Sequence, residues 1–271
     1  MIVKKSENID YIVFDPSKNI TALIISKVDP SSHVEISKMI MDKEPQVEQV
    51  GFLTYDGGLD ISLRMAGGEF CGNATMCAAV YCAMKNDLSN ANIKVKVFGV
   101  DEIINVEVKK TNDDEWEGIV KMPKALEIKD VTFPDGKTLP VVFYSRIAHI
   151  IIQDDGGIKP IHDKEGAELT IKKYCDFLKV PALGMMYFNS KDSNLVPLVY
   201  VKSVDTLFWE NSCASGTTAV GAWLFNKENE NNAAKRLKID VNQPSGAILT
   251  IYNNKNGSIY LKGEVRKAQK C

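Results

Sequence analysis

The sequence predicts a mixed α/β (α+β) protein built from two pseudo-symmetric domains, each with one buried helix at its centre. Short segments rich in β-branched residues run along the whole chain and are separated by turn signals. Two segments, 73–84 and 215–226, are apolar all round, which is typical of buried helices. A length of 271 residues fits two domains at roughly 150 residues each.

Most elements follow from local patterns. The strand-like segments are 11–14, 21–26, 49–54, 61–65, 93–98, 103–108, 141–143, 147–152, 185–188, 195–201, 247–252 and 258–262. Ser31 or Ser32 can cap a helix that runs to about Met41, and 165–178 has an amphipathic helical pattern. Residues 253–257, between two alternating runs, predict a hairpin. The acidic runs 113–117 and 228–232 are expected to be solvated loops.

The two apolar helices are alike. Each follows a cysteine, Cys71 or Cys213, with a glutamate (Glu69 or Glu210) just before it. The cysteines lie about half the chain apart, which indicates a weak internal repeat. Segment 121–135 contains two prolines and is the expected crossing between domains. We therefore expect domains at 1–127, to which the tail 264–271 can be added, and 128–263.

Composition excludes several functions. There are 33 Lys and Arg against 35 Asp and Glu, so a bulk basic surface for nucleic acid is not expected. No apolar stretch approaches the ~20 residues that span a bilayer, and the first residues lack a secretion signal. We expect a cytoplasmic protein whose partner is a small molecule rather than nucleic acid or a membrane.

The cysteines and histidines also limit the chemistry. Six cysteines in a long chain without a secretion signal do not indicate structural disulfides. Without a CxxC motif, a thiol redox protein is disfavoured, although two facing cysteines could oxidise. Only three histidines are present, and the glycine-rich nucleotide motifs and GxSxG are absent. Few ways therefore remain to build a His-based metal site, so we expect no metal, and the sequence signals for nucleotide cofactors are missing.

A cysteine at the start of a helix is suited to acid–base chemistry. The helix dipole and free backbone amides stabilise its thiolate, and the same amides can bind a carboxylate. Gly72 and Ala214 let a ligand approach the backbone closely. If two such sites faced each other across a cleft, one thiolate could remove a proton from a carbon and the other thiol could return one to its opposite face. This arrangement suits racemisation or epimerisation.

The runs 67–75 and 209–217 resemble the paired motifs of the diaminopimelate epimerase family. The similarity extends to 15–19, to 48–50 and to the strand of His149, so it covers most of the chain. It implies a cofactor-independent enzyme with two catalytic cysteines. It also implies a diaminopimelate-epimerase-like fold of two similar α/β domains, each a curled mixed sheet or barrel around one central helix. Members are often dimers, so a homodimer is also expected.

Three differences from diaminopimelate epimerase concern the far end of the substrate. Asn211 stands where that enzyme has Arg, Ile147 stands where it has Asn, and a further Asn near 185–186 is missing. A second carboxylate would lack a cation there, so we expect a shorter, less charged substrate. Segments 48–52, 67–76, 184–188, 209–217 and 243–249 resemble the cofactor-independent histidine racemases of opine-type (staphylopine-type) metallophore synthesis. This resemblance implies interconversion of L-histidine and D-histidine.

The resemblance also implies roles for individual residues. Cys71 and Cys213 would be the catalytic acid and base. The substrate-binding groups would be the backbone amides of Gly72, Asn73, Ala214 and Ser215 for the carboxylate, Glu210 for the ammonium, and the side chains of Asn19 and Asn73 for the amino-acid head. His149 would lie near the site.

The imidazole of the substrate needs its own partner. Glu48 is the preferred residue because a carboxylate accepts an imidazole N–H. Gln49 and Asn211 are alternatives. Phe14, Phe52 and Trp209 could form a wall for the ring, although such aromatic residues are more often part of a core.

Other functions remain open at this stage. The chain could be an epimerase or racemase of another amino acid, with diaminopimelate disfavoured. It could also be a non-catalytic member of the fold that binds a small metabolite. Replacing either cysteine by serine distinguishes these classes, because only catalysis requires the thiols.

Overall fold

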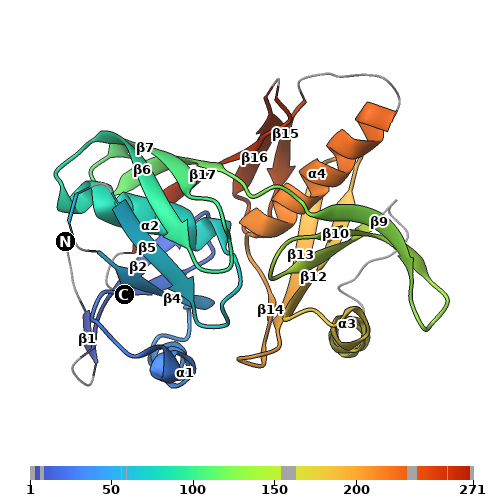
Figure 1. The fold of residues 1–271 in the computed structure, drawn as a ribbon, viewed down its shortest axis with the longest axis horizontal. Coiled ribbons are helices and arrows are strands. Elements are labelled where there is room, and N and C mark those ends of the chain that lie inside the picture. The colour runs from blue at the N-terminus through green and yellow to red at the C-terminus, as the bar shows by residue number, and fades with distance from the viewer. Residues whose placement is uncertain are drawn as a thin grey trace. The chain divides into compact units, whose positions relative to one another are not determined.

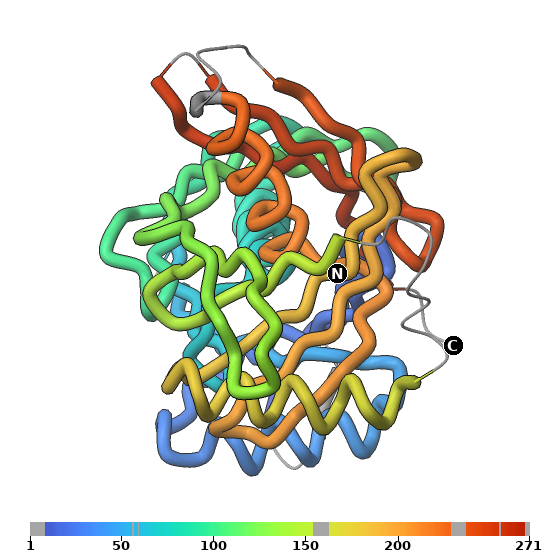
Figure 2. The backbone as a smooth tube through the Cα atoms, turned by 90° about the vertical axis from the view of Figure 1, so that its right-hand side faces the viewer, coloured from blue at the N-terminus to red at the C-terminus, as the bar shows by residue number. Residues whose placement is uncertain are grey.

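The computed structural model describes residues 4–6, 9–55, 57–58, 60–153, 163–230, 237–254 and 256–268. The chain divides into two compact units, which are drawn from two directions in Figures 1 and 2. Unit 1 comprises Met1–Lys121 and Lys262–Cys271, and unit 2 comprises Met122–Leu261. The sequence analysis expects the crossing within 121–135, a boundary after residue 127 and a C-terminal tail from 264 in the first domain; the two compact units divide after Lys121 and again after Leu261.

Unit 1 is a closed barrel. Its strands are β1 (Lys4–Ser6), β2 (Ile9–Pro16), β3 (Thr21–Ile24), β4 (Gln49–Thr54), β5 (Asp60–Met65), β6 (Asn90–Val97), β7 (Ile104–Asn112), β8 (Glu115–Lys121) and the end of β17 (Ile259–Lys267). Neighbouring strands pair in chain order from β2 to β8, and β17 pairs with both β2 and β8. The β3–β4 and β5–β6 pairs are parallel, so the sheet is mixed.

Helix α2 (Gly72–Lys85) packs against β2, β3 and β5 to β8, and nearly all of its residues are buried. Small and apolar side chains on every side let it fill this interior. Helix α1 (His33–Lys43), preceded by the short 3-10 helix η1 (Pro30–Ser32), packs on the opposite face of the sheet. Residues of β4 therefore alternate between the α2 face and the α1 face.

Unit 2 repeats this plan. Its strands are β9 (Glu127–Thr132), β10 (Thr138–Phe143), β11 (Ala148–Gln153), β12 (Ala182–Asn189), β13 (Asn194–Val201), β14 (Thr206–Trp209), β15 (Lys238–Asn242) and β16 (Ile248–Asn253). Helix α4 (Ala214–Glu230) packs against β10, β11, β12 and β16. Helix α3 (Lys164–Leu178) covers the other face of β12 and β13, over a core that includes Ile171, Tyr174 and Cys175.

Apart from β14, which has no counterpart between β5 and α2, the order of elements in the series below is the same in the two units. The series β2–β3–α1–β4–β5–α2–β6–β7 corresponds to β10–β11–α3–β12–β13–α4–β15–β16. The parallel pairs also correspond, since β3–β4 matches β11–β12 and β5–β6 matches β13–β15. The predicted class, two similar α/β domains with a central helix each, is confirmed.

Two predicted loops differ from the structure. The acidic run 113–117 is not a loop throughout, because β8 begins at Glu115. Trp116 is buried, whereas its glutamate neighbours face outward. Because the run contains only one apolar residue, the sequence does not reveal the alternation that is typical of a strand. In the run 228–232, helix α4 continues to Glu230, and 231–232 lie outside the described residues. His162 and Cys271 also lie outside them.

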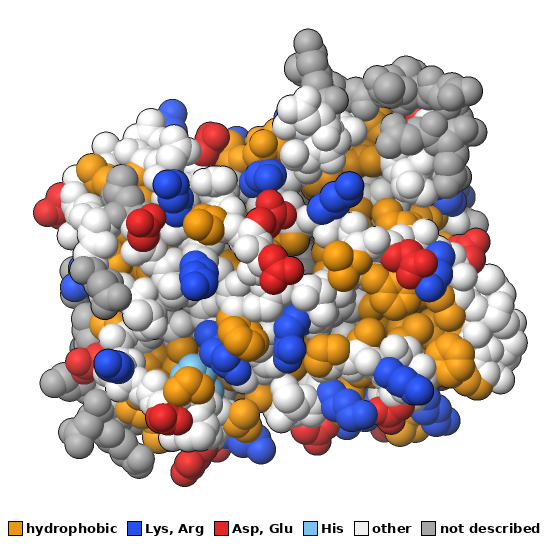
Figure 3. All heavy atoms as spheres, in the orientation of Figure 1, with side chains coloured by type: hydrophobic (Ala, Val, Ile, Leu, Met, Phe, Trp, Pro, Cys, Tyr) orange, Lys and Arg blue, Asp and Glu red, His pale blue; other side chains and the backbone are white. Residues whose placement is uncertain are grey.

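The surface charges and the helix lengths agree with the balanced charge and the short apolar stretches of the sequence. The face drawn in Figure 3 mixes basic, acidic and hydrophobic side chains. Within the described part of the chain, no helix is both long and apolar enough to cross a membrane.

Candidate active site

Cys71 lies at the N-terminal end of α2, where the extended backbone turns into the helix. Its sulfur accepts a hydrogen bond from the backbone N–H of Ala74, at 3.4 Å. Its carbonyl accepts two bonds from Thr75, from the N–H at 3.0 Å and from Oγ1 at 2.7 Å. The cysteine therefore caps the helix through its own side chain.

Cys213 has the same arrangement at the start of α4. Its sulfur accepts the backbone N–H of Gly216 at 3.3 Å. Its carbonyl accepts the N–H of Thr217 at 2.9 Å and the hydroxyl of Thr217 at 2.7 Å. The common spacing Cys-x-x-x-Thr thus produces the same three hydrogen bonds in both units. In each, the two residues after the cysteine supply first-turn amides, which are suited to bind an anion.

In unit 1 the predicted site residues form one hydrogen-bonded network. The Cys71 thiol donates to Gln49 Oε1 at 3.0 Å. Gln49 Nε2 donates in turn to Asn19 Oδ1 and to Thr21 Oγ1. Asn19 accepts a second bond from Asn73 Nδ2 at 2.9 Å and donates to Glu48 Oε2 at 2.6 Å. Residues from two strand regions and from α2 are therefore held together around Cys71.

In unit 2 the backbone of Cys213 is held by Gln243, which follows β15. The amide oxygen of Gln243 accepts the Cys213 N–H at 3.0 Å, and its amide nitrogen donates to Thr217 Oγ1 at 3.1 Å. Gln243 is only 4% exposed. We did not predict this role, although Gln243 lies in one of the segments that carry the family resemblance. Apart from this resemblance, the sequence offers one weak indication of the role, namely a polar residue at the start of a turn segment.

Burial and charge keep Cys213 in its thiol form in the unliganded protein. Burial is the largest cause that raises the pKa of this thiol well above its usual range, and the charge of Glu210 and a hydrogen bond with it add to the effect. Ser215 and the Gly216 N–H oppose it. Glu210 and Ser215 therefore both lie close enough to the sulfur of Cys213 to change its pKa, in opposite directions.

Asn211 lies between Glu210 and the cysteine. Its carbonyl oxygen accepts the backbone N–H of Ser245 at 3.1 Å, which ties this segment to the β15–β16 connection.

His149 lies on β11, deeper in unit 2 than Cys213. The imidazole is fully buried, and neither ring nitrogen has a hydrogen-bond partner among the described residues. Burial lowers the pKa of His149 to about 3, so the ring is neutral. Met186 lies between the two residues, because a Cβ at Gly184 would meet both His149 and Met186, and a Cβ at Gly216 would meet both Met186 and Cys213.

Two of the aromatic residues considered as walls for a ring pack on the outer-helix sides of their sheets. Phe52 faces the α1 side of the sheet and stacks on His33, with ring centroids 3.6 Å apart. Trp209 packs with the cluster under α3 and donates its indole N–H to Glu168 at 2.8 Å. Phe14 is fully buried. These side chains therefore serve the cores of their units.

The described residues contain no group of three or more His, Cys, Asp or Glu side chains arranged to hold a metal ion. The five described cysteines are all free. Cys77, Cys82 and Cys175 are buried, and burial is the main cause that raises the pKa of each thiol.

Solved structures of similar fold include proteins described as an epimerase and a racemase, and also phenazine biosynthesis proteins. A predicted epimerase from Pseudomonas aeruginosa superimposes with a TM-score of 0.69, at 12% identity, over 96% of both chains. A probable proline racemase from Agrobacterium radiobacter K84 gives the same TM-score at 10% identity, over 97% of this chain and 93% of that chain. At these identities the likeness shows a shared fold.

Sequence comparison places the chain more narrowly. The family model described as the histidine racemase CntK N-terminal domain matches residues 8–269. The histidine racemase of Staphylococcus aureus (strain Mu50) is 32% identical over 89% of this chain and 87% of its own. The histidine racemase of Fusobacterium nucleatum subsp. nucleatum is 33% identical over 97% of this chain and 95% of its own. The chain belongs to the histidine racemase family, a family of isomerases.

Proposed function

We propose that this enzyme interconverts L-histidine and D-histidine with two cysteines as acid and base, without a cofactor. The observation that carries the proposal is the repeated geometry of Cys71 and Cys213. Both sulfurs lie at the start of a buried helix and accept the N–H three residues on. One such cysteine in each of two similar units supplies one proton acceptor and one proton donor for a single α-carbon.

The reaction needs one thiolate and one thiol. The thiolate takes the α-proton from one face of the amino acid, which leaves the electron pair on the α-carbon and its carboxylate. The thiol of the second cysteine then donates its proton to the opposite face. The first cysteine ends protonated and the second ends as thiolate, so the reverse reaction exchanges their roles.

The first-turn amides stabilise the charge that develops on the substrate carboxylate. In this proposal the N–H groups of Gly72 and Asn73 bind it from one helix, and those of Ala214 and Ser215 bind it from the other. The Asn19 and Asn73 side chains, which are linked by a hydrogen bond, fix the amino-acid head.

Glu210 connects substrate binding to the reactivity of Cys213. Its negative charge is one cause of the raised pKa of the Cys213 thiol. In the proposed complex the substrate ammonium pairs with Glu210 and offsets this charge. The pKa of Cys213 then falls when the amino acid binds, so the thiolate forms where it is needed.

Glu48 is the proposed partner of the substrate imidazole. Its carboxylate is oriented by Asn19 Nδ2, at 2.6 Å, and can accept an imidazole N–H. Gln49 and Asn211 remain alternatives for this contact. We propose that His149 supports the site through Met186 rather than by direct contact, because the ring is fully buried.

We also propose that the enzyme works in the cytoplasm as a homodimer. Free thiols in all five described cysteines suit a reducing compartment. Light scattering of the purified protein would test the dimer.

The deciding experiment follows loss of the α-proton in heavy water. The reduced protein is incubated with a panel of L-amino acids and meso-diaminopimelate, and exchange is read by proton NMR and inversion by chiral chromatography. We expect both with histidine. Cys71→Ser and Cys213→Ser should each abolish racemisation, whereas Cys175→Ser, which preserves a buried hydrogen bond to Val180, should not.

The outcomes separate the alternatives. Exchange of another amino acid in place of histidine would keep the two-thiol reaction and reject the substrate. No exchange with any amino acid would favour a binding protein. Activity that survives alkylation of both cysteines would reject the mechanism, and loss of activity with hydroxylamine or a chelator would reject cofactor independence.

A further inference from the structure

A cavity of about 610 Å³ lies in unit 1, away from the cysteine. Its walls come from the loop after β3, the start of α1, and strands β4, β5 and β6. The side chains that matter below are those of Lys27, His33, Phe52, Arg64, Lys96 and Phe98. None of the residues proposed above for catalysis or substrate binding lines it.

The cavity lies on the face of the sheet opposite to Cys71. Gln49, which accepts the Cys71 thiol, and Phe52 are three residues apart on β4, so their side chains point to opposite faces. Phe52 pairs with Arg64 across β4 and β5, and Ser62 pairs with Lys96 across β5 and β6. The side chains of these partners lie on the face of the sheet on which α1 packs.

Aromatic and basic groups meet in this cavity. The His33 ring is stacked parallel on Phe52, and the guanidinium of Arg64 lies 3.7 Å from the centre of the Phe98 ring. Phe98 is 41% exposed, so part of its ring is accessible from solvent. In Figure 3 a histidine lies among hydrophobic and basic side chains on the part of the face where α1 and β4 are labelled in Figure 1.

Among the described residues, the positive charges of the cavity have no carboxylate partner. Lys27, Arg64 and Lys96 line the cavity, and none of them forms an ion pair with a described residue. No described Asp or Glu lines it. The carboxylate of the nearby Asp29 accepts hydrogen bonds from the N–H and the hydroxyl of Ser31 at the start of η1.

His33 adds an unused polar group. It is 95% buried, and its Nδ1 has no hydrogen-bond partner among the described residues. The charge of Arg64 contributes, after burial, to a lowered pKa of the His33 ring. A cation and a neutral imidazole are therefore held close together on one wall. A buried polar group without a partner is costly unless a ligand or water completes it.

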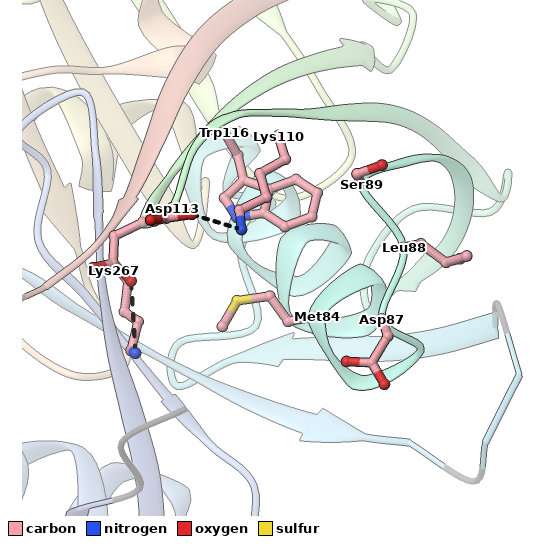
Figure 4. A pocket seen from close by; sticks show the side chains of 9 residues that line it. Met84, Asp87, Leu88, Ser89, Lys110, Asp113, Trp116 and Lys267 are labelled. Atoms are coloured by element: carbon pink, nitrogen blue, oxygen red, sulfur yellow. Dashed lines mark hydrogen bonds and ion pairs between the residues drawn. The ribbon is translucent and has the colours of Figure 1, made fainter.

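A second cavity of unit 1 provides a contrast (Figure 4). It is lined by residues that include Met84, Trp116, Lys110 and Lys267. Here Lys110 pairs with Asp113 at 3.4 Å, and Lys267 pairs with Asp114 at 3.7 Å. Its charges are already balanced, so it has no comparable demand for an anion.

We propose that the cavity beside Arg64 and Phe98 is a second binding site, which takes a small anion joined to a planar ring. The anionic group would lie between Arg64, Lys96 and Lys27, and the ring would pack against the guanidinium plane and Phe98. The volume is within the roughly 300–1,000 Å³ of small-molecule sites. This inference does not depend on the proposed racemase reaction.

Two ligand sources share this chemistry, a nucleoside monophosphate and an aromatic carboxylate. We would titrate the full chain with adenosine 5′-monophosphate and indole-3-acetate by calorimetry at low salt, and with adenosine and inorganic phosphate as the separate halves. At least one ring-bearing anion should bind saturably and at least about tenfold more tightly than adenosine or phosphate alone. Added salt should weaken it.

Variants test the position of the site. Arg64→Gln should weaken binding about tenfold or more, and Arg64→Lys should weaken it less, because the charge remains but the planar fork is lost. Lys94→Gln removes a charge from the same strand as Lys96, outside the cavity lining, and should change affinity less than about twofold. Urea unfolding followed by circular dichroism reports that each variant is folded.

Three results would overturn the proposal. The first is that none of the probes saturates. The second is that Lys94→Gln weakens binding as much as Arg64→Gln. The third is that histidine, or alkylation of Cys71, competes with the anion, since the ligand would then occupy the cysteine site.

Discussion

The thiol of Cys71 donates a hydrogen bond to Gln49 Oε1, 3.0 Å away. Gln49 is fixed in this orientation, because its amide nitrogen donates to Asn19 and to Thr21. An amide oxygen can only accept, so the network holds Cys71 with its proton pointing at Gln49. Gln49 is therefore a positioning residue for Cys71, whatever contact it also makes with substrate.

Gln49→Leu removes this acceptor. We expect kcat to fall about tenfold to a hundredfold with little change in KM, since one hydrogen bond to a reacting group is lost. Steady-state kinetics with L-histidine measures both constants. Gln46→Leu is the control, because Gln46 is exposed and bonds only to Glu44. A rise in KM with unchanged kcat would instead make Gln49 the imidazole partner.

Gln243→Leu removes the side chain that holds the Cys213 backbone. Both groups that it serves, the Cys213 N–H and the Thr217 hydroxyl, are buried. We expect a loss of about 1–3 kcal/mol in the free energy of unfolding, measured in urea, together with a lower kcat. Gln153→Leu, on an exposed position of β11, should leave both unchanged. Normal stability with normal kcat in Gln243→Leu would contradict this role.

Gly216→Ala introduces a methyl group where there is no room. Its Cβ would lie 2.1 Å from the sulfur of Met186 and 3.1 Å from that of Cys213. Alanine favours a helix by about 1 kcal/mol over glycine, so a loss of stability or activity must come from the clash. We expect activity to fall at least about tenfold because Cys213 is displaced.

The double variant Gly216→Ala/Met186→Ala provides the control. Removing the Met186 side chain makes room for the new methyl, so the double variant should recover part of the activity lost in Gly216→Ala. Such contacts couple by about 0.5–3 kcal/mol in a double-mutant cycle. Purely additive effects would show that Met186 does not transmit the clash.

Local patterns predicted much of the fold. Strand β4 was predicted at 49–54, as observed, and α2 was predicted at 73–84 against the observed Gly72–Lys85. These elements carry their signal within their own residues. Strand β15 was missed because most of its residues are not buried, and it is held by pairing with β13 and β16. Pairing between distant segments leaves no local pattern.

The residues of the candidate site likewise divide into those that a local motif indicates and those that only the assembled fold brings together. The two cysteines and their first-turn amides are contained in short motifs, so the sequence could indicate them. Gln243 comes 30 residues after Cys213, and Met186 and His149 come from strands before it. Their contacts depend on how β11, β12 and β15 assemble around α4, which no spacing in the sequence reveals. Likewise, only the assembled fold shows that Met186 lies close to both His149 and Cys213.

His149 should make the protein sensitive to acid. Its pKa is lowered to about 3 by burial, while an unfolded histidine has a pKa of about 6.5. Between these values the unfolded state binds more protons than the folded state, so stability is lost as the pH falls from about 6.5 to about 3. The loss approaches ~1.4 kcal/mol per pH unit. The variant His149→Leu lacks this proton and should show a shallower slope of the free energy of unfolding between pH 6.5 and 4, measured in urea. His33→Leu is the comparison, because its pKa is also lowered but the ring is less deeply buried. Equal slopes in the wild type and His149→Leu would mean that the imidazole gains a proton, or a partner, in the folded state.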